Sequence, residues 1–275
     1  MGEAFSIWDE GKRNSCVTLI YEAKFAESYR NVLVTWKKSV ENYSLSISVE
    51  NPLNETRCKI DMRGKKGLKS LEMGEKRVEV FWDFREAKFS ENPEPWSKYY
   101  VAIVQEEEVV LVVGDMKKEA LKRTKKREGM EEAKLLCKKE YIYGKKVLST
   151  KVMVDKKEHE VVIELSCGIG EPELSISIDS YEVIHVMNLN WRFRGNENVN
   201  ITNNGQLQVQ VYWDVHDWLF APASASGTTG NALFIFKEME KNTFHNNNRT
   251  GLWFDHSPLD STPAFFHVIY ASKFD

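Results

Sequence analysis

Alternating apolar and polar positions run through much of the chain and predict β-strands. In YSLSISVE (43–50), leucine, isoleucine and valine alternate with serine. In VEVFWD (78–83), two valines and Trp82 fall on one face. A period of two is typical of strands with one buried and one solvated face, as in antiparallel sheets. The pattern therefore predicts a mainly β fold.

Four of these apolar blocks occur twice, in the same order and about 130 residues apart. This indicates a tandem duplication, with a first β-domain over 1–127 and a second over 128–275. Each copy is expected to hold about seven or eight strands, arranged as a barrel or as a two-layer sandwich. The paired blocks are NVLVT (31–35) and EVVIE (160–164), YSLSISVE (43–50) and ELSISID (173–179), VEVFWD (78–83) and VQVYWD (209–214), and YVAIV (100–104) and ALFIF (232–236).

One helix is predicted between the copies. Residues 116–127 are almost all good helix formers, and Asp115 is placed to cap the first turn. The segment is strongly basic, with Glu119 as its single acid. Its cations are Lys117, Lys118, Lys122, Arg123, Lys125, Lys126 and Arg127. Such a run either contacts an anion or a partner, or is a solvated helix face.

The block VVLVV (109–113) departs from the alternation. Its apolar residues would fall on both faces of a strand, so we expect a strand covered on both sides. The second face of this strand could be covered by a sister domain or by the narrow apolar stripe of the predicted helix. That stripe is formed by Met116, Ala120, Leu121 and Thr124.

Near the C-terminus, residues 232–236 are predicted to pair with 265–270 in a hairpin. The intervening segment 237–263 is rich in Asn, His and Thr and is interpreted as a loop insertion. The Asn203-Asn204-Gly205 sequence is a strong hairpin turn signal.

Composition excludes several classes. The 275 residues are 42% hydrophobic and 29% charged, which is globular, and 38 basic against 41 acidic side chains give a net charge of -3. This balance does not favour nucleic acid, and four cysteines are too few for a disulfide scaffold. No secretory signal or spanning segment is evident, so we expect a soluble protein of the cytoplasm or the nucleus. Met1-Gly2 with Ser6 fits the bare myristoylation template, although Glu3 disfavours it.

Several blocks together resemble the plant family of unknown function DUF868. The resemblance covers residues 16–237 and implies a plant origin, but it brings no known activity, cofactor or catalytic residue. One departure is 62–67, which lacks the aromatic and basic stretch of the family. The matching blocks are NVLVTWKK (31–38), LSISVENP (45–52), CKIDM (58–62), VEVFWD (78–83), EEVVLVVGDMKKEALKRTK (107–125), NWRFRGNE (190–197), VYWDVHDWLF (211–220) and ALFIFK (232–237).

One cluster suggests acid–base chemistry, because His216 lies between Asp214 and Asp217. The other copy has Arg85 and Glu86 at the positions of His216 and Asp217, which favours a structural turn. In both copies an aspartate follows the core tryptophan, and its carboxylate is expected to accept backbone N–H bonds. No zinc spacing, phosphate loop, dinucleotide fingerprint or nucleophile elbow occurs, so no metal or cofactor is predicted.

The sequence therefore favours a non-enzymatic interaction module that binds a protein partner through its edges, loops and basic helix. The alternative is a binding site for a lipid or small apolar ligand, in a barrel or in a cleft between the domains. An enzyme at that cleft, using His216 and its neighbouring carboxylates, is less favoured. Specific recognition of nucleic acid is not expected.

Overall fold

In the computed structural model of the chain, the described residues form strands and two helices. The chain divides into two compact units, one of residues 1–144 with 269–275 and the other of 145–268. No helix among the described residues is long and apolar enough to cross a membrane. The described residues are 15–39, 42–50, 55–61, 64–73, 76–90, 92–143, 147–155, 157–166, 170–201, 207–221, 230–239 and 265–272.

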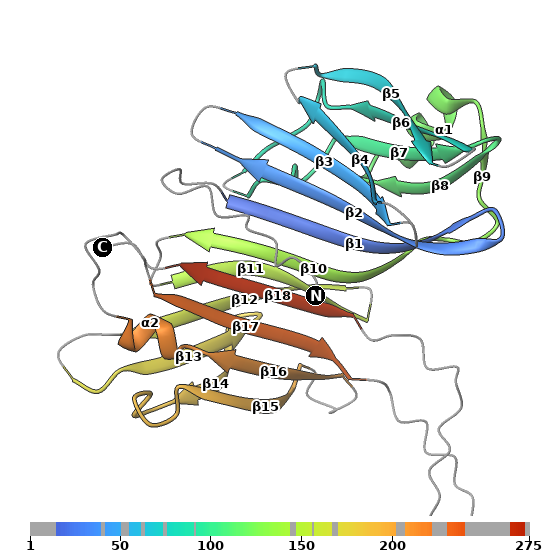
Figure 1. The fold of residues 1–275 in the computed structure, drawn as a ribbon. Helices are drawn as coiled ribbons and strands as arrows, with labels where there is room; N and C mark the ends of the chain where they lie inside the picture. Colours follow the sequence, from blue (N-terminus) through green and yellow to red (C-terminus); the bar gives the residue numbers. More distant parts are fainter. Residues whose placement is uncertain are drawn as a thin grey trace, which may run out of the picture. The chain divides into compact units, whose positions relative to one another are not determined.

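The fold is mainly β, as predicted, and none of the described sheets closes into a barrel (Figure 1). The barrel alternative is therefore wrong. Neighbouring strands pair antiparallel, for example Ser15–Phe25 with Ser28–Lys38 and Lys66–Met73 with Lys76–Asp83, and a short parallel pairing joins Glu108–Val113 to Arg127–Glu128.

The first unit contains two sheets. In one, the strand order is β10 (Lys134–Tyr143), β1 (Ser15–Phe25), β2 (Ser28–Lys38), β3 (Tyr43–Glu50) and β4 (Glu55–Asp61). In the other, the order is β5 (Lys66–Met73), β6 (Lys76–Asp83), β7 (Tyr100–Gln105), β8 (Glu108–Val113) and β9 (Arg127–Glu128).

The inner faces of these two sheets share one core. Alternate residues of β2 and β3 pack with those of β6 and β7 in a single apolar cluster. At its centre Trp36 is fully buried and meets Phe84 and Tyr99 edge-on, with ring centroids 5.7 and 5.5 Å apart. The first unit is therefore a two-layer sandwich, because side chains from both sheets fill the space between them.

The helix α1 (Lys117–Thr124) covers the outer face of the second sheet (Figure 1). Ala120 is fully buried there, in an apolar cluster with Phe81 and Ala102, and Met116 and Leu121 pack against it. The helix ends three residues earlier than predicted, because Lys125 takes a left-handed conformation with φ of 56°.

Asp115 does not cap α1, which corrects the sequence prediction. Its two carboxylate oxygens instead accept the backbone N–H groups of Lys98, at 2.9 Å, and Tyr99, at 3.1 Å. The residue therefore fixes the start of β7, and α1 has no side-chain N-cap hydrogen bond.

Strand β8 is covered on both faces, as its apolar run predicted. Val110, Leu111 and Val113 belong to the inner core, while Val109 packs in the cluster under α1. The helix is thus the cover of the outer face. A register shift opposite Ile103 and Val104 lets both Val110 and Leu111 face the core.

The second unit has the same kind of elements. One sheet has the order β11 (Val147–Val154), β12 (Lys157–Ser166), β13 (Glu173–Ile178) and β14 (Tyr181–Val186). In the other, the order is β15 (Arg194–Asn200), β16 (Gln208–Asp214) and β17 (Asn231–Glu238), and the neighbour of β17 is β18 (Phe266–Ser272), whose residues from 269 onward belong to the first unit. The predicted hairpin partners 232–236 and 265–270 are therefore neighbours. The Asn-Asn-Gly turn, most of the 237–263 insertion and Gly2 lie outside the described residues.

A second helix, α2 (His216–Phe220), follows β16 where the sequence predicted only a turn. Strand pairing also corrects one of the aligned blocks. The alignment of 100–104 with 232–236 places Leu233 at the position of Val101. Trp82 pairs with Val101, but Trp213 pairs with Phe234, one residue later than the alignment requires. In a strand this single residue decides which face a side chain takes.

Candidate functional site

Each of the two units contains a corner that is built around a tryptophan at the end of a strand. The indole Nε1 of Trp82 donates to the carbonyl oxygen of Gly64 at 2.8 Å. In the second unit, Nε1 of Trp213 donates to the carbonyl oxygen of Arg192 at 3.0 Å. Each indole therefore fixes the chain that leads into the neighbouring strand, β5 or β15.

The aspartate after each tryptophan closes a turn, as predicted. Oδ1 of Asp83 accepts the backbone N–H of Arg85 at 3.2 Å, and Oδ1 of Asp214 accepts that of His216 at 3.1 Å. The equivalent bonds show that this carboxylate has the same local role in both units.

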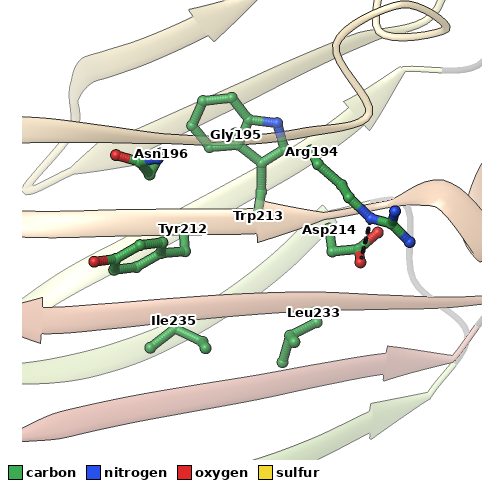
Figure 2. A pocket seen from close by; sticks show the side chains of 8 residues that line it. All are labelled: Arg194, Gly195, Asn196, Tyr212, Trp213, Asp214, Leu233 and Ile235. Carbon is green, nitrogen blue, oxygen red and sulfur yellow. Dashed lines mark hydrogen bonds and ion pairs between the residues drawn. The ribbon is translucent and has the colours of Figure 1, made fainter.

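The cations around the two aspartates differ. In the first unit, Arg85 donates Nε and Nη2 to Asp83, the latter at 2.8 Å, and Lys66 Nζ lies 3.5 Å away. In the second unit, Arg194 Nε donates to Asp214 at 2.8 Å (Figure 2). The first corner therefore holds two cations for one carboxylate, and the second holds one.

The pKa of Asp83 is held below its ordinary value. Burial opposes the charged form, but the hydrogen bonds from the Arg85 side chain and backbone, with the charges of Arg85 and Lys66, outweigh that effect. Asp83 is thus a stable anion that is already neutralised by its own neighbours.

The predicted acid–base cluster does not form a reactive arrangement. His216 Nδ1 contacts Asp217 Oδ1 at 2.9 Å with both side chains largely exposed, while Asp214 is directed to Arg194. The imidazole packs between Phe193 and Phe220, with centroids 5.2 and 5.3 Å away. This geometry matches a structural turn that opens into α2.

A hollow of about 320 Å³ lies on the outer face of the second unit's corner (Figure 2). Arg194 and Asp214 lie at one end and pair with each other. Tyr212, Leu233 and Ile235 form much of the remaining wall. The wall is therefore apolar with no net charge, and neither His216 nor Asp217 lines it.

The equivalent hollow of the first unit, about 400 Å³, is cationic because α1 forms one side of it. Tyr100 and Met116 supply its remaining wall. Four cations face two carboxylates, which leaves an excess of two positive charges. The charged residues are Lys66, Asp83, Arg85, Glu119, Lys122 and Arg123.

The seven predicted basic residues separate into two groups. Three form ion pairs with nearby acids: Lys117 with Glu128 at 2.6 Å, Lys126 with Glu107 at 2.5 Å and Arg127 with Glu108 at 2.5 Å. The other four are exposed and have no ion-pair partner among the described residues; they are Lys118, Lys122, Arg123 and Lys125.

Only Lys122 and Arg123 of the predicted group line the hollow. The residues that face them, Lys66, Arg85 and Tyr100, were not predicted. The repeated Trp-Asp dipeptide marked the corner in the sequence, but nothing local indicated which side chains would surround it.

The sequence prediction also missed a buried histidine that is paired with an aspartate. His159 on β12 is 3% exposed, and its Nδ1 lies 2.7 Å from Asp179 Oδ2. The bond to His159 is the main reason why the pKa of Asp179 lies below its ordinary value. Nε2 of His159 has no hydrogen-bond partner, and no cluster of three metal-ligating side chains occurs in the described parts of the chain. His159 is buried, but Asp179 is exposed and also accepts the backbone N–H of Glu160, so the pair has a structural role where the core meets the surface.

The fold defines a mainly β protein with paired open sheets, in which a basic helix lies over one of two equivalent corners. The chain belongs to the family DUF868, described as a plant protein of unknown function, which matches residues 12–273. This confirms the resemblance found in the sequence and extends it at both ends. No curated protein and no solved structure matches the chain.

Proposed function

We propose that this protein is a non-enzymatic interaction module, built by duplication of one β-domain, that binds an acidic protein partner in the cytoplasm or nucleus through α1. One observation carries the proposal. The four exposed cations of α1 and the residue after it have no ion-pair partner among the described residues. These are Lys118, Lys122, Arg123 and Lys125.

The helix presents these cations from a fixed position. Its apolar side is packed on the sheet through Ala120, Met116 and Leu121. Lys117 at its start pairs with Glu128 of β9, and Lys126 just after its end pairs with Glu107 in the turn before β8. A surface that is already ordered loses little conformational entropy when a partner binds, which favours affinity.

The other candidate functions have less support. Several large aromatic side chains, among them Trp36, Phe234 and Phe236, are fully buried and fill the cores of the sheets. His216 is taken up by a turn, with its neighbouring aspartate bound to Arg194. Neither arrangement favours an apolar ligand or an acid–base reaction.

The proposal is tested with the full chain as bait in plant extract. We compare wild type with the variant Lys118→Gln/Lys122→Gln/Arg123→Gln/Lys125→Gln. A matched control makes the same charge change elsewhere, at Lys134, Lys139, Lys157 and Arg192. We expect proteins that are enriched by wild type and by the control but lost with the α1 variant. Recovery that is identical for all three baits, or absent for wild type, would contradict the proposal.

A further inference from the structure

The hollow beside α1 has a tyrosine in its wall. The Tyr100 side chain lines the hollow, is only 2% exposed, and makes no hydrogen bond with the described residues. A hydroxyl group that lines a hollow and has no hydrogen-bond partner among the described residues can donate to a bound ligand, so Tyr100 is a candidate ligand donor.

Positive charge is concentrated around this hydroxyl. Burial and the charge of Asp83 raise the pKa of Tyr100, while the charges of Arg123 and Arg85 act on the same group in the opposite direction. Asp83 is already held by Arg85 and Lys66. Arg123 and Lys122 therefore remain available, with no ion-pair partner among the residues that the structure describes.

The second unit shows that an excess of positive charge beside a hydroxyl group is not a general property of the corner. Strand pairing places Leu233 opposite Asp214, where Tyr100 lies opposite Asp83. The equivalent hollow thus has no hydroxyl at that position, and its single cation is paired. Lys122 and Arg123 of α1 make one of the two related hollows cationic, and Tyr100 adds a hydroxyl group to it.

We propose that the hollow formed by Lys122, Arg123, Tyr100 and Arg85 binds the phosphate of a phosphorylated side chain in a protein partner. The inference rests on the proposed interaction function and names the group that α1 recognises. A phosphomonoester carries nearly two negative charges at neutral pH, which matches the excess of two positive charges. Its oxygens accept bonds from a guanidinium, an ammonium and a hydroxyl group.

The geometry favours a protein-borne phosphate over a membrane or a nucleic acid. The apolar side of α1 is buried on the sheet and is not available for insertion into a bilayer. The four cations of the α1 segment without an ion-pair partner among the described residues are few for tracking a phosphate backbone, and the chain has a net charge of -3. A recess of about 400 Å³ suits one phosphate group with the side chain that carries it.

Calorimetry with the full chain tests this. The probe is a capped Gly-Ala-phosphoserine-Ala-Gly peptide, compared with the serine and glutamate forms, inorganic phosphate, and vesicles that contain phosphatidylserine. We expect Lys122→Gln/Arg123→Gln to weaken binding of the phosphopeptide by about tenfold or more. The matched control, Lys118→Gln/Lys125→Gln, removes the same charge from cations that do not line the hollow, and should change binding less than about threefold. Tyr100→Phe should weaken binding without loss of fold.

Equal loss in both double variants would overturn the proposal in favour of diffuse attraction. So would equal binding of the serine or glutamate peptide, no binding of the phosphopeptide, or preferred binding to the vesicles. Inorganic phosphate that binds as well as the peptide would overturn the protein-borne source and leave a free anion as the ligand. If the phosphopeptide fails while extract proteins still depend on α1, only this inference is wrong and the interaction function stands.

Discussion

Gly67 on β5 lies directly opposite Trp82 on β6, and a Cβ atom at Gly67 would come within 2.2 Å of Cζ2 of the indole. Gly195 and Trp213 have the same relationship in the second unit, also at 2.2 Å. No side chain fits at either glycine unless the indole moves. Since each indole also donates a hydrogen bond to the chain before the glycine, the close approach is part of the corner.

Gly67→Ala should therefore destabilise the protein by about 2 kcal/mol, because the new methyl group overpacks the indole. Gly195→Ala should have a similar effect on the second unit. Urea unfolding provides the measurement. In the background of Trp82→Phe, which removes the ring atoms that clash, Gly67→Ala should cost clearly less. If the effects of the two substitutions were additive, the contact with the indole would not be the reason why residue 67 must be glycine.

Attachment of α1 should depend on Ala120. Ala120→Asp places a carboxylate in the apolar cluster with Phe81 and Ala102 and should cost about 2 kcal/mol or more. Detachment would be seen as faster proteolysis between residues 114 and 127. Lys118→Asp, on the exposed side of the same helix, is the control and should leave cleavage nearly unchanged. Similar proteolysis of the two variants would contradict the observed packing.

Asp115 should stabilise the start of β7 and not the helix. Asp115→Asn keeps one acceptor oxygen and should lose one of the two bonds to Lys98 and Tyr99, at a cost of about 1 kcal/mol. Asp115→Ala should cost more, while the helical signal in circular dichroism stays the same. A selective loss of helix in either variant would restore the capping role that the sequence suggested.

The ion pairs of Asp83 should make the free energy of unfolding depend on pH in the acidic range. Because the pKa of Asp83 is lowered in the folded state, its contribution is complete above the unfolded value of about 4 and is lost as the pH falls through the folded value. The difference in unfolding free energy between wild type and Asp83→Asn should therefore shrink from pH 5 toward about pH 2. Arg85→Gln should reduce this acid dependence. A difference that stays constant over that range would be inconsistent with the arrangement.

Local patterns predicted a good part of this structure. The apolar run 109–113 predicted a strand covered on both faces, and α1 with the inner core provides that cover. The repeated Trp-Asp dipeptide predicted a turn in which the carboxylate accepts a backbone N–H, and both corners contain it. These features depend on side chains close in sequence, so the pattern contains the necessary information.

Features that depend on distant contacts were missed. The aligned block at 232–236 was one residue out of register, because Leu233 and Ile235 on the outer face are as apolar as their inner neighbours. Asp115 looked like a cap, but its carboxylate accepts backbone N–H groups from the two residues before β7. The hollow is lined by α1 together with Lys66 on β5 and Tyr100 on β7, which belong to other elements of the fold. No local period indicates such a meeting.

Amide chemical-shift mapping tests the central claim most directly, because it compares the two equivalent corners within one molecule. Isotope-labelled full-length protein is titrated with the phosphoserine peptide. The account predicts shifts at Lys66, Arg85, Tyr100 and the Met116–Arg123 side of the first hollow, with Arg194, Tyr212 and Leu233 of the second hollow unchanged. Shifts of equal size at both corners, or shifts confined to residues away from α1, would contradict it.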